Sequence, residues 1–459
     1  MAELDLDDIQ GLILRGYRPM RRARHLLLQI NDRETFKAAL RDLATEDRAS
    51  GPFVTVAADW TDKPPAGVTP DHCVNIAFTY SGLQALALPD ASLQSFPDEF
   101  REGAVTRAGE VGDTNANAPQ HWIEPLNPDN HTAVHVVLSL FARADQALDD
   151  LTRELRSRTV QNGATRELLQ WDAGALYDDH DRAGYVHFGY RDGLSQPTID
   201  GAQMAGIPDP LEPVPPGEFV LGHPTQRPHH IYPVPTPTAL GHNGSFAAFR
   251  IAEQDVTAFD DFLSAKSDGT PAGRELLAAR LCGRWRNGVP LVMSPHSDTP
   301  IPSAELNMFD YAGVHPDPYG TLCPLGSHIR RANPRRARVM GGGGDKRRLV
   351  RRGLPYGPPY DPAQADDGQA RGLVGMFICA SLREQFEFAM GEWLNDGIFA
   401  RGLARTKDPL TGNNDPEGEF TAPGSPALHL TGLSQFVTTR GAAYCFLPSM
   451  TGLRHLANQ

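Results

Sequence analysis

Segments in which apolar residues alternate, as in β-strands, are followed repeatedly by segments in which apolar residues recur with the spacing of an α-helix. Leu26, Leu28 and Ile30 fall on one face of an expected strand, and the next apolar residues recur at the period of an amphipathic helix. Such strands are expected at residues 24–31, 74–80, 135–142, 184–188, 245–252 and 375–381. Strand–helix units with antiparallel returns predict an α+β fold, in which helices cover one face of each antiparallel sheet.

A proline-rich stretch over residues 207–241 divides the chain into two halves. With 459 residues the chain is long for one small core, so two domains are expected. We predict domains at residues 1–205 and 206–459, the second interrupted by a long insertion over about residues 264–370. Functional residues in this insertion are expected on irregular structure that the scaffold holds in place.

The net charge of −13 argues against nucleic acid and anionic membranes as partners. The five cysteines are widely spaced and odd in number, and no CxxC occurs. Buried free thiols in a reducing compartment are therefore favoured over a disulfide framework. The sequence has no basic and apolar leader and no apolar stretch near twenty residues. We therefore expect a cytoplasmic protein that does not enter the membrane.

Two stretches concentrate residues with chemical potential. Residues 322–357 are rich in arginine around a single histidine, His328, and contain a run of four consecutive glycines, Gly341 to Gly344. This basic run in an acidic chain suggests a locally held anionic ligand, although a solvated basic loop is the simpler interpretation. Residues 187–197, HFGYRDGLSQP, hold Asp192 between two glycines. An acid in such a loop can be a general acid/base, a metal ligand or only a turn former.

Taken together, GYRDGLSQP, CPLGSHIRRANPR and RRGLPYG resemble motifs of the dye-decolorizing peroxidases, a family of haem peroxidases. Other segments, such as DIQGLILRGY near the start and GRWRNGVPL from Gly283, extend the resemblance over nearly the whole chain. The chain is most similar to the larger members of that family. The resemblance implies two ferredoxin-like domains, each an antiparallel sheet with helices packed on it, related to the dimeric α+β barrels. It also implies haem b as the cofactor.

The resemblance assigns three main roles. His328 is the expected proximal ligand of the haem iron, because a neutral imidazole supplies an axial nitrogen. Asp192 is the expected distal acid/base, since a carboxylate can move a proton between the two oxygens of peroxide. Arg351 is the expected distal cation, which stabilises negative charge on the leaving oxygen. A thiolate from Cys323 is an alternative iron ligand.

Further cofactor contacts follow from the same resemblance. Arg335 and Arg191 are candidate partners for a haem propionate, because arginine can pair with a carboxylate in a bidentate way. Leu373 matches a distal apolar residue of the family. Gly375 stands where a phenylalanine is common, so we expect a wider distal pocket that Phe377 or Met376 partly fills.

Two oxidisable side chains and one replacement complete the expected site. Tyr356, expected in an open turn, and Trp393 are candidates for passing electrons from bulky dyes, although helical spacing favours a packing role for Trp393. Where similar family members have a glutamate that accepts a hydrogen bond from the proximal histidine, this chain has Ala443. His328 then needs another acceptor, or its iron is less electron-rich.

The sequence therefore predicts a haem peroxidase that reduces hydrogen peroxide and oxidises phenolic or dye-like donors in one-electron steps through a ferryl intermediate. Hydrogen peroxide and a small reducing donor are the expected partners, and a homodimer is an open alternative. Ala443 and Gly375 favour a second hypothesis, a haem-binding protein for sensing, storage or haem handling with little peroxidase activity. A zinc- or aspartate-based hydrolase is a third hypothesis, for which the sequence offers no ligand cluster.

Overall fold

The computed structural model describes residues 3–45, 53–60, 70–179, 181–182, 184–202, 209–340, 347–362, 367–403, 406–424 and 427–459. The four glycines of the arginine-rich run, Gly341 to Gly344, lie outside the described residues.

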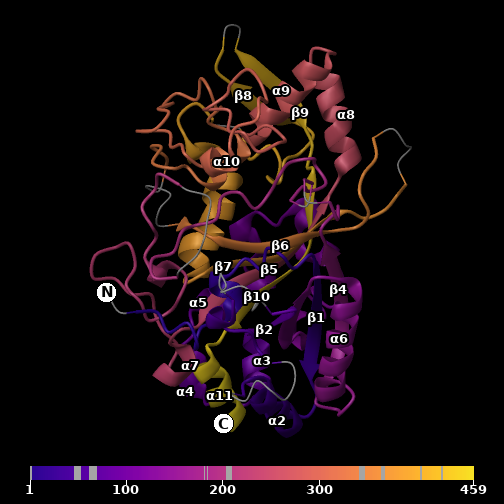
Figure 1. Cartoon of the computed structure of the whole chain (residues 1–459), viewed down its shortest axis with the longest axis vertical. Coiled ribbons are helices and arrows are strands. Elements are labelled where there is room, and N and C mark those ends of the chain that lie inside the picture. Colours follow the sequence, from indigo (N-terminus) through magenta and orange to yellow (C-terminus); the bar gives the residue numbers. More distant parts are fainter. Residues whose placement is uncertain are drawn as a thin grey trace.

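The strands have the following bounds: β1 (Arg22–Ile30), β2 (His72–Phe78), β3 (Val136–Ala142), β4 (Thr165–Gly174), β5 (Ser245–Gln254), β6 (Val350–Tyr356), β7 (Gly372–Cys379), β8 (Gly418–Ala422), β9 (Leu428–Leu433) and β10 (Val437–Leu447). Eight of them form one sheet in the order β4-β1-β3-β2-β10-β5-β7-β6, and β8 pairs with β9 in a separate ribbon (Figure 1).

The helices have the following bounds: α1 (Gly11–Leu14), α2 (Arg33–Leu43), α3 (Tyr80–Ala85), α4 (Asp90–Gln94), α5 (Asp98–Thr106), α6 (Asp145–Thr159), α7 (Thr238–Gly241), α8 (Val256–Lys266), α9 (Pro271–Cys282), α10 (His328–Ala332) and α11 (Met450–Asn458). Two consecutive π-helical segments, η9 (Leu382–Glu387) and η10 (Ala389–Leu394), follow β7.

The sheet consists of two halves with the same internal order. When the four strands of each half are numbered along the chain, β4-β1-β3-β2 and β10-β5-β7-β6 both read 4-1-3-2, the strand order of a ferredoxin-like unit. The halves join where Phe78 of β2 pairs with Phe446 of β10. The antiparallel α+β fold predicted from the strand–helix pattern is confirmed. The domain boundary at residues 205 and 206 stays a prediction.

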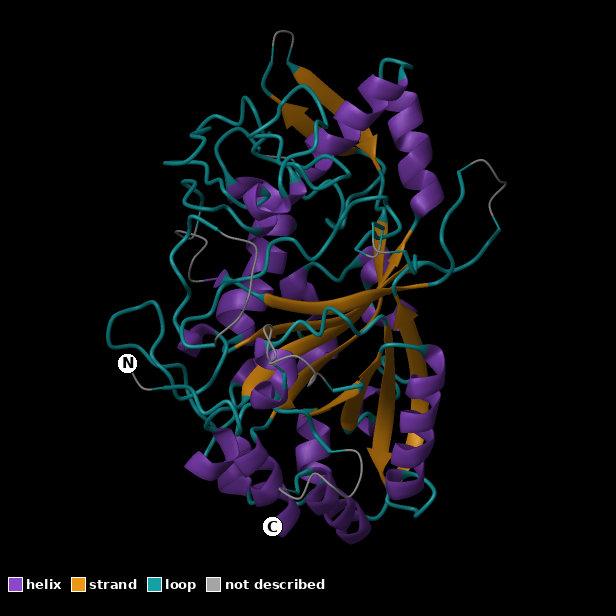
Figure 2. Ribbon diagram, in the orientation of Figure 1, coloured by secondary structure: helices purple, strands orange, loops and turns teal. Residues whose placement is uncertain are grey.

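Helices pack on the sheet as their apolar spacing predicts. Leu148, Leu151 and Leu155 are buried on one side of α6, which packs against β1 and β3 (Figure 2). The described residues contain no helix that is both long enough and apolar enough to cross a membrane.

Two sequence-based assignments were wrong. Residues 184–188 form one arm of a tight hairpin in which Tyr185 bridges to Arg191, and the fourth strand of the first half is β4 instead. Its run TRELLQWDAG is half exposed and rich in polar residues, so it lacks a clear apolar alternation. Arg351 lies on β6 and not on irregular structure. Pro355 weakened the signal for this strand, yet β6 is an edge strand, where proline is tolerated.

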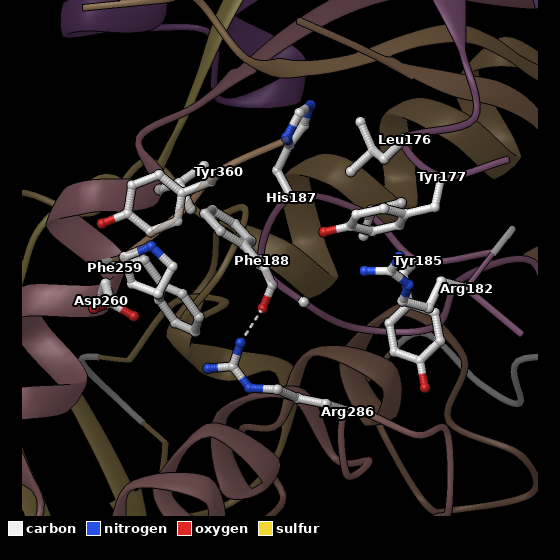
Figure 3. Close-up of a pocket in the computed structure, with 14 residues that line it drawn as sticks. Leu176, Tyr177, Arg182, Tyr185, His187, Phe188, Phe259, Asp260, Arg286 and Tyr360 are labelled. Carbon is white, nitrogen blue, oxygen red and sulfur yellow. Dashed lines mark hydrogen bonds between the residues drawn. The ribbon is translucent and has the colours of Figure 1, made fainter. Parts of the chain in front are cut away.

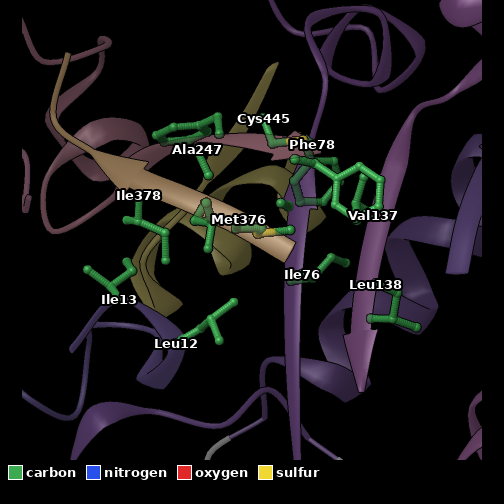
Figure 4. Packing of buried hydrophobic residues seen from close by; sticks show 14 of the residues in the cluster. Leu12, Ile13, Ile76, Phe78, Val137, Leu138, Ala247, Met376, Ile378 and Cys445 are labelled. Carbon is green, nitrogen blue, oxygen red and sulfur yellow. The ribbon is translucent and has the colours of Figure 1, made fainter. Parts of the chain in front are cut away.

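Part of the core lies on one face of β7. Met376 and Ile378 project from β7 into a cluster that also contains Leu12 and Ile13 near the N-terminus (Figure 4). Because successive side chains of a strand point to opposite faces, Leu373 and Phe377 project to the other face. That other face carries the candidate site.

Candidate active site

Strands β6 and β7 hold three predicted site residues on one face. Arg351 lies opposite Phe377 and Pro355 lies opposite Leu373 in the antiparallel register. Directly paired residues share a face, so Arg351, Leu373 and Phe377 line the same side of the sheet. All three are only half buried, in contrast with the fully buried residues on the core face.

Gly375 lies on this same face, between Leu373 and Phe377. A side chain at this position would collide with β6, because an added Cβ would lie 2.0 Å from the carbonyl oxygen of Arg352. The close approach of the two strands therefore requires glycine here. Met376, which we expected to help fill the distal pocket, is buried in the core on the opposite face.

Asp192 is carried to this face by the hairpin around residues 184–192. Its N–H donates to the carbonyl oxygen of Gly184 at 2.8 Å. Gly189 and Gly193 take φ values of 80° and 73°, a conformation that glycine adopts without strain. The Nη1 atom of Arg351 then lies 3.3 Å from Oδ1 of Asp192. The two residues predicted for the distal side thus contact each other.

The segment after Asp192 fixes the backbone of Arg351. The side-chain amide of Gln196 donates to the carbonyl oxygen of Arg351 at 3.1 Å and accepts from its N–H at 3.1 Å. These are the bonds that a neighbouring strand would make to the free edge of β6. The carbonyl oxygen of Ser195 also accepts from Nη2 of Arg351 at 3.3 Å. Gln196 and Ser195 are contributors that we did not predict.

His328 begins the short helix α10, and its partner is a residue that the sequence did not reveal. Nδ1 of His328 donates to the carboxylate of Asp408, at 3.0 Å from Oδ2 and 3.1 Å from Oδ1. The carboxylate is fully buried, and it also accepts from the N–H groups of Leu410 at 3.0 Å and Thr411 at 2.8 Å. Asp408 is therefore the acceptor that His328 needs.

Ala443 does not belong to the surroundings of His328. It lies on β10 opposite Phe249, which in turn lies opposite Met376, so its side chain belongs to the core face. Of the two outcomes expected from Ala443, the structure shows the first: His328 has another acceptor, a carboxylate that reaches it from residue 408. The sequence gives little indication of Asp408. It is an acid before a proline in a polar loop, TKDPLTGNN, which has no periodic pattern.

Electrostatic interactions connect the two sides of the site. Desolvation by the surrounding protein alone would raise the pKa of Asp192, but the Arg351 guanidinium and the Gly193 N–H hold it below its ordinary value, and His328 adds to this lowering when it is protonated. Burial would likewise raise the pKa of Asp408, and the adjacent His328 keeps it low. Burial alone would lower the pKa of His328, yet the Asp408 carboxylate raises it above its ordinary value.

The two predicted propionate partners lie near the Asp192 segment. The guanidinium of Arg335 is buried and bonded to Asp209 at 3.0 Å and to Ser195 Oγ at 3.0 Å. Arg191 is half buried, and its N–H donates to the carbonyl oxygen of Arg286 at 2.9 Å. A propionate would have to share Arg335 with Asp209. The role of both arginines stays a prediction.

The expected electron-transfer residues are buried. Tyr356 lies on β6 and is 7% exposed. Its ring contacts the Trp171 ring edge-on, with 5.1 Å between the ring centroids, so it does not lie in an open turn. Trp393 is 1% exposed, and its indole N–H donates to the carbonyl oxygen of Met340 at 3.1 Å. Neither side chain reaches the surface to meet a bulky dye directly. Cys323, the alternative iron ligand, is fully buried, and burial raises the pKa of its thiol.

Comparisons with known proteins agree with this architecture. A family model described as the DyP dimeric alpha+beta barrel domain matches residues 8–173. Dye-decolorizing peroxidase msp1 of Mycetinis scorodonius is 30% identical over 488 aligned residues, which cover 99% of this chain and 88% of that protein. A dye-decolorizing peroxidase of Exidia glandulosa is also 30% identical, with 99% and 87% covered.

Solved structures show the same relationship. A dye-decolorizing peroxidase in complex with 2,6-dimethoxyphenol matches with a TM-score of 0.81 at 28% identity, covering 99% of this chain and all of that one. A triple mutant of the decolorizing peroxidase from Auricularia auricula-judae matches with a TM-score of 0.82 at 26% identity. The repeated α+β unit and these full-length matches define a peroxidase. The chain belongs to the dye-decolorizing peroxidase family.

Proposed function

We propose that the protein is a haem b peroxidase that reduces hydrogen peroxide and oxidises phenolic or dye-like donors in one-electron steps. The observation that carries the proposal is the pairing of His328 with a buried carboxylate, close to an Asp192–Arg351 pair that it influences electrostatically. A ligand histidine oriented by an acid and a distal acid next to an arginine are the two parts that this chemistry requires.

The residues present fit a haem. His328 donates through Nδ1 to Asp408, which leaves Nε2 as the coordinating nitrogen and fixes the tautomer. The face that carries Arg351 also offers Leu373 and Phe377 as half-buried apolar surface for a macrocycle. The bound haem would supply the iron that cleaves the O–O bond and exchanges electrons with donors. We propose Arg335 and Arg191 as its propionate partners.

Asp192 would move the proton. Its low pKa keeps the carboxylate ionised in moderate acid, so it can accept a proton from one peroxide oxygen. The same carboxyl group then returns the proton to the other oxygen, which leaves as water. Arg351 holds Asp192 in place and offers a permanent positive charge to the departing oxygen.

The donor class is supported by the relatives. One solved dye-decolorizing peroxidase is a complex with 2,6-dimethoxyphenol, and several curated relatives are named dye-decolorizing peroxidases. Tyr356 and Trp393 would act as buried relays and not as surface contacts, given their burial. A homodimer and a cytoplasmic location stay predictions.

The alternative of a haem-handling protein has lost its two supports. The first was Ala443, but Asp408 already serves as the acceptor for His328. The second was Gly375, which the close packing of β6 and β7 requires. A zinc hydrolase is not favoured either, since the described residues hold no group of three or more His, Cys, Asp or Glu side chains suited to a metal ion.

Reconstitution with haem and assay of peroxide-dependent oxidation tests the proposal. The haem-loaded protein should oxidise 2,6-dimethoxyphenol and an anthraquinone dye between about pH 4 and about pH 7 only when peroxide is added. His328→Ala should abolish both activities together with the Soret band. Full haem binding without turnover of either donor would contradict the proposal and favour haem handling.

A further inference from the structure

A cavity lies beside the hairpin that carries Asp192. It has a volume of about 190 Å³. Sites for drug-sized ligands commonly have volumes of roughly 300–1,000 Å³, so this cavity has room only for a smaller molecule. The lining comes from residues 176–177, 182 and 185–189, the first turns of α8, Arg286 and the loop after β6. Asp192, Arg351 and His328 do not line it, so it is distinct from the candidate active site.

Aromatic rings form the walls of this cavity. The buried rings of Phe188 and Phe259 lie 4.6 Å apart, and Tyr360 packs against the same cluster. Tyr177 lies across the cavity from them, as Figure 3 shows. The guanidinium of Arg182 stacks on the Tyr177 ring at 4.2 Å. Aromatic side chains thus lie on two sides of the cavity, which suits an aromatic ligand between them.

The charges around the cavity are balanced. Each charged side chain of the lining has an opposite charge beside it: Arg182 pairs with Asp179, Arg286 with Glu275, and Asp260 with Arg274. The cavity is therefore nearly neutral, and it favours an uncharged aromatic molecule over a sulfonated dye.

The segment that lines the cavity is connected to the segments that carry Asp192 and Arg351. The hairpin that lines the cavity through Tyr185, His187 and Phe188 ends at Asp192. Nε2 of His187 donates to the carbonyl oxygen of Tyr356 at 2.7 Å, and Tyr356 follows Arg351 on β6. A molecule in the cavity thus contacts the hairpin directly, and His187 connects that hairpin to β6.

We propose that this cavity binds the reducing donor, a single-ring substituted phenol. This inference rests on the proposed peroxidase function, and it locates the binding site of the reducing donor. Each phenol loses one electron and one proton and becomes a phenoxyl radical. Two phenols and one hydrogen peroxide therefore yield two phenoxyl radicals and two waters. Sulfonated polycyclic dyes are both too large and too charged for the cavity.

Tyrosine variants of the haem-loaded enzyme test this site with 2,6-dimethoxyphenol as the probe. Tyr177→Ala and Tyr360→Ala each remove one aromatic wall, and we expect each to raise the phenol KM about tenfold, which corresponds to about 1.4 kcal/mol. The KM for an anthraquinone dye and the rate of reaction with peroxide should not change. Tyr319→Ala is the matched control, because Tyr319 is 77% exposed and lies outside the cavity.

Two further measurements separate binding from other roles. Tyr177→Phe and Tyr360→Phe keep the ring, so their phenol KM should stay near the wild-type value. Calorimetry with the resting enzyme should show phenol binding that the alanine variants weaken by the same factor. An unchanged phenol KM in both alanine variants would contradict phenol binding in this cavity. A loss of kcat alone in the phenylalanine variants would contradict it as well. Failure of the proposed peroxidase function would appear separately, as phenol binding without peroxide turnover.

Discussion

Nδ1 of His328 lies 3.0 Å from Oδ2 of Asp408, a carboxylate that is fully buried and is also bonded to the backbone of its own turn. Because this carboxylate cannot swing away without losing those bonds, it fixes both the tautomer and the orientation of the imidazole ring. An anionic acceptor also makes the imidazole a stronger electron donor to a metal. With His328 as the proposed iron ligand, the pair would determine how firmly the haem is held and how its iron is tuned.

Removing the acceptor should weaken the cofactor site. We expect Asp408→Ala to lower haem affinity or the rate of reaction with peroxide by about 10- to 100-fold, the usual cost of losing such a partner. The reduction potential of the bound haem should rise, because the histidine donates less electron density. Haem titration and spectroelectrochemistry measure both effects. Asp415→Ala, which changes an exposed acid of the same loop, should leave both unchanged.

The proximal histidine itself should be indispensable for the cofactor. His328→Ala removes the axial nitrogen, so we expect at least a tenfold weaker haem affinity, which is roughly 1.4 kcal/mol or more. The Soret absorbance during haem titration provides the measurement. His296→Ala, at an exposed histidine, is the control. A variant at residue 328 with the wild-type spectrum and affinity would refute the ligand assignment.

The pH dependence should report the Asp192–Arg351 pair. The pKa of Asp192 is lowered, chiefly by Arg351 acting against desolvation, so its ionised form persists into acid. The reaction with peroxide should therefore decline only as the pH falls through that low pKa. In Arg351→Leu the pKa rises, and the decline should begin at higher pH. Rapid-mixing rates across the acid range measure this shift.

The control for that shift is Arg336→Leu. Arg336 belongs to the same arginine-rich run, but it is exposed and pairs with Asp310. Its loss should leave the pH profile in place. An acid decline at the same pH in the wild type and in Arg351→Leu would contradict the coupling of Asp192 to Arg351.

A buried ion pair away from the reactive groups should support stability. Arg250 of β5 bonds both carboxylate oxygens of Asp113, at 2.8 and 2.7 Å, with both side chains almost fully buried. Asp113→Ala leaves the guanidinium without its counter-charge, so we expect a loss of about 3–5 kcal/mol. Glu253→Ala breaks the partly exposed Arg440–Glu253 pair and should cost at most about 1 kcal/mol. Urea denaturation compares the two variants.

The fold was largely predictable because strands such as β1 and β5 carry apolar residues on a buried face. Five strands were not predicted, namely β4, β6, β8, β9 and β10. The physical reasons are clearest for β4 and β6. The edge strand β4 is partly exposed and keeps polar residues, and β6 contains arginine, glycine and proline, which disfavour strands. Their neighbours in the sheet, and not their own composition, make them strands.

The site was predictable only where residues fall in recognisable motifs. Asp192 and Arg351 do, and the structure brings them into contact. Asp408 and Gln196 act through hydrogen bonds to residues 80 and 155 positions away, respectively, and no local pattern encodes such distant partners. Ala443 was misread because its position in a motif does not reveal which face of β10 it occupies.

The most direct test mixes haem-loaded protein with one equivalent of peroxide and follows the Soret band by stopped flow. In the wild type we expect the band to fall and shift within seconds at about pH 4 and at about pH 7. Asp192→Asn should keep the resting spectrum and slow this change about 10²- to 10⁴-fold, the usual contribution of a positioned proton carrier. An unchanged rate in the variant, or no spectral change in the wild type, would contradict the account.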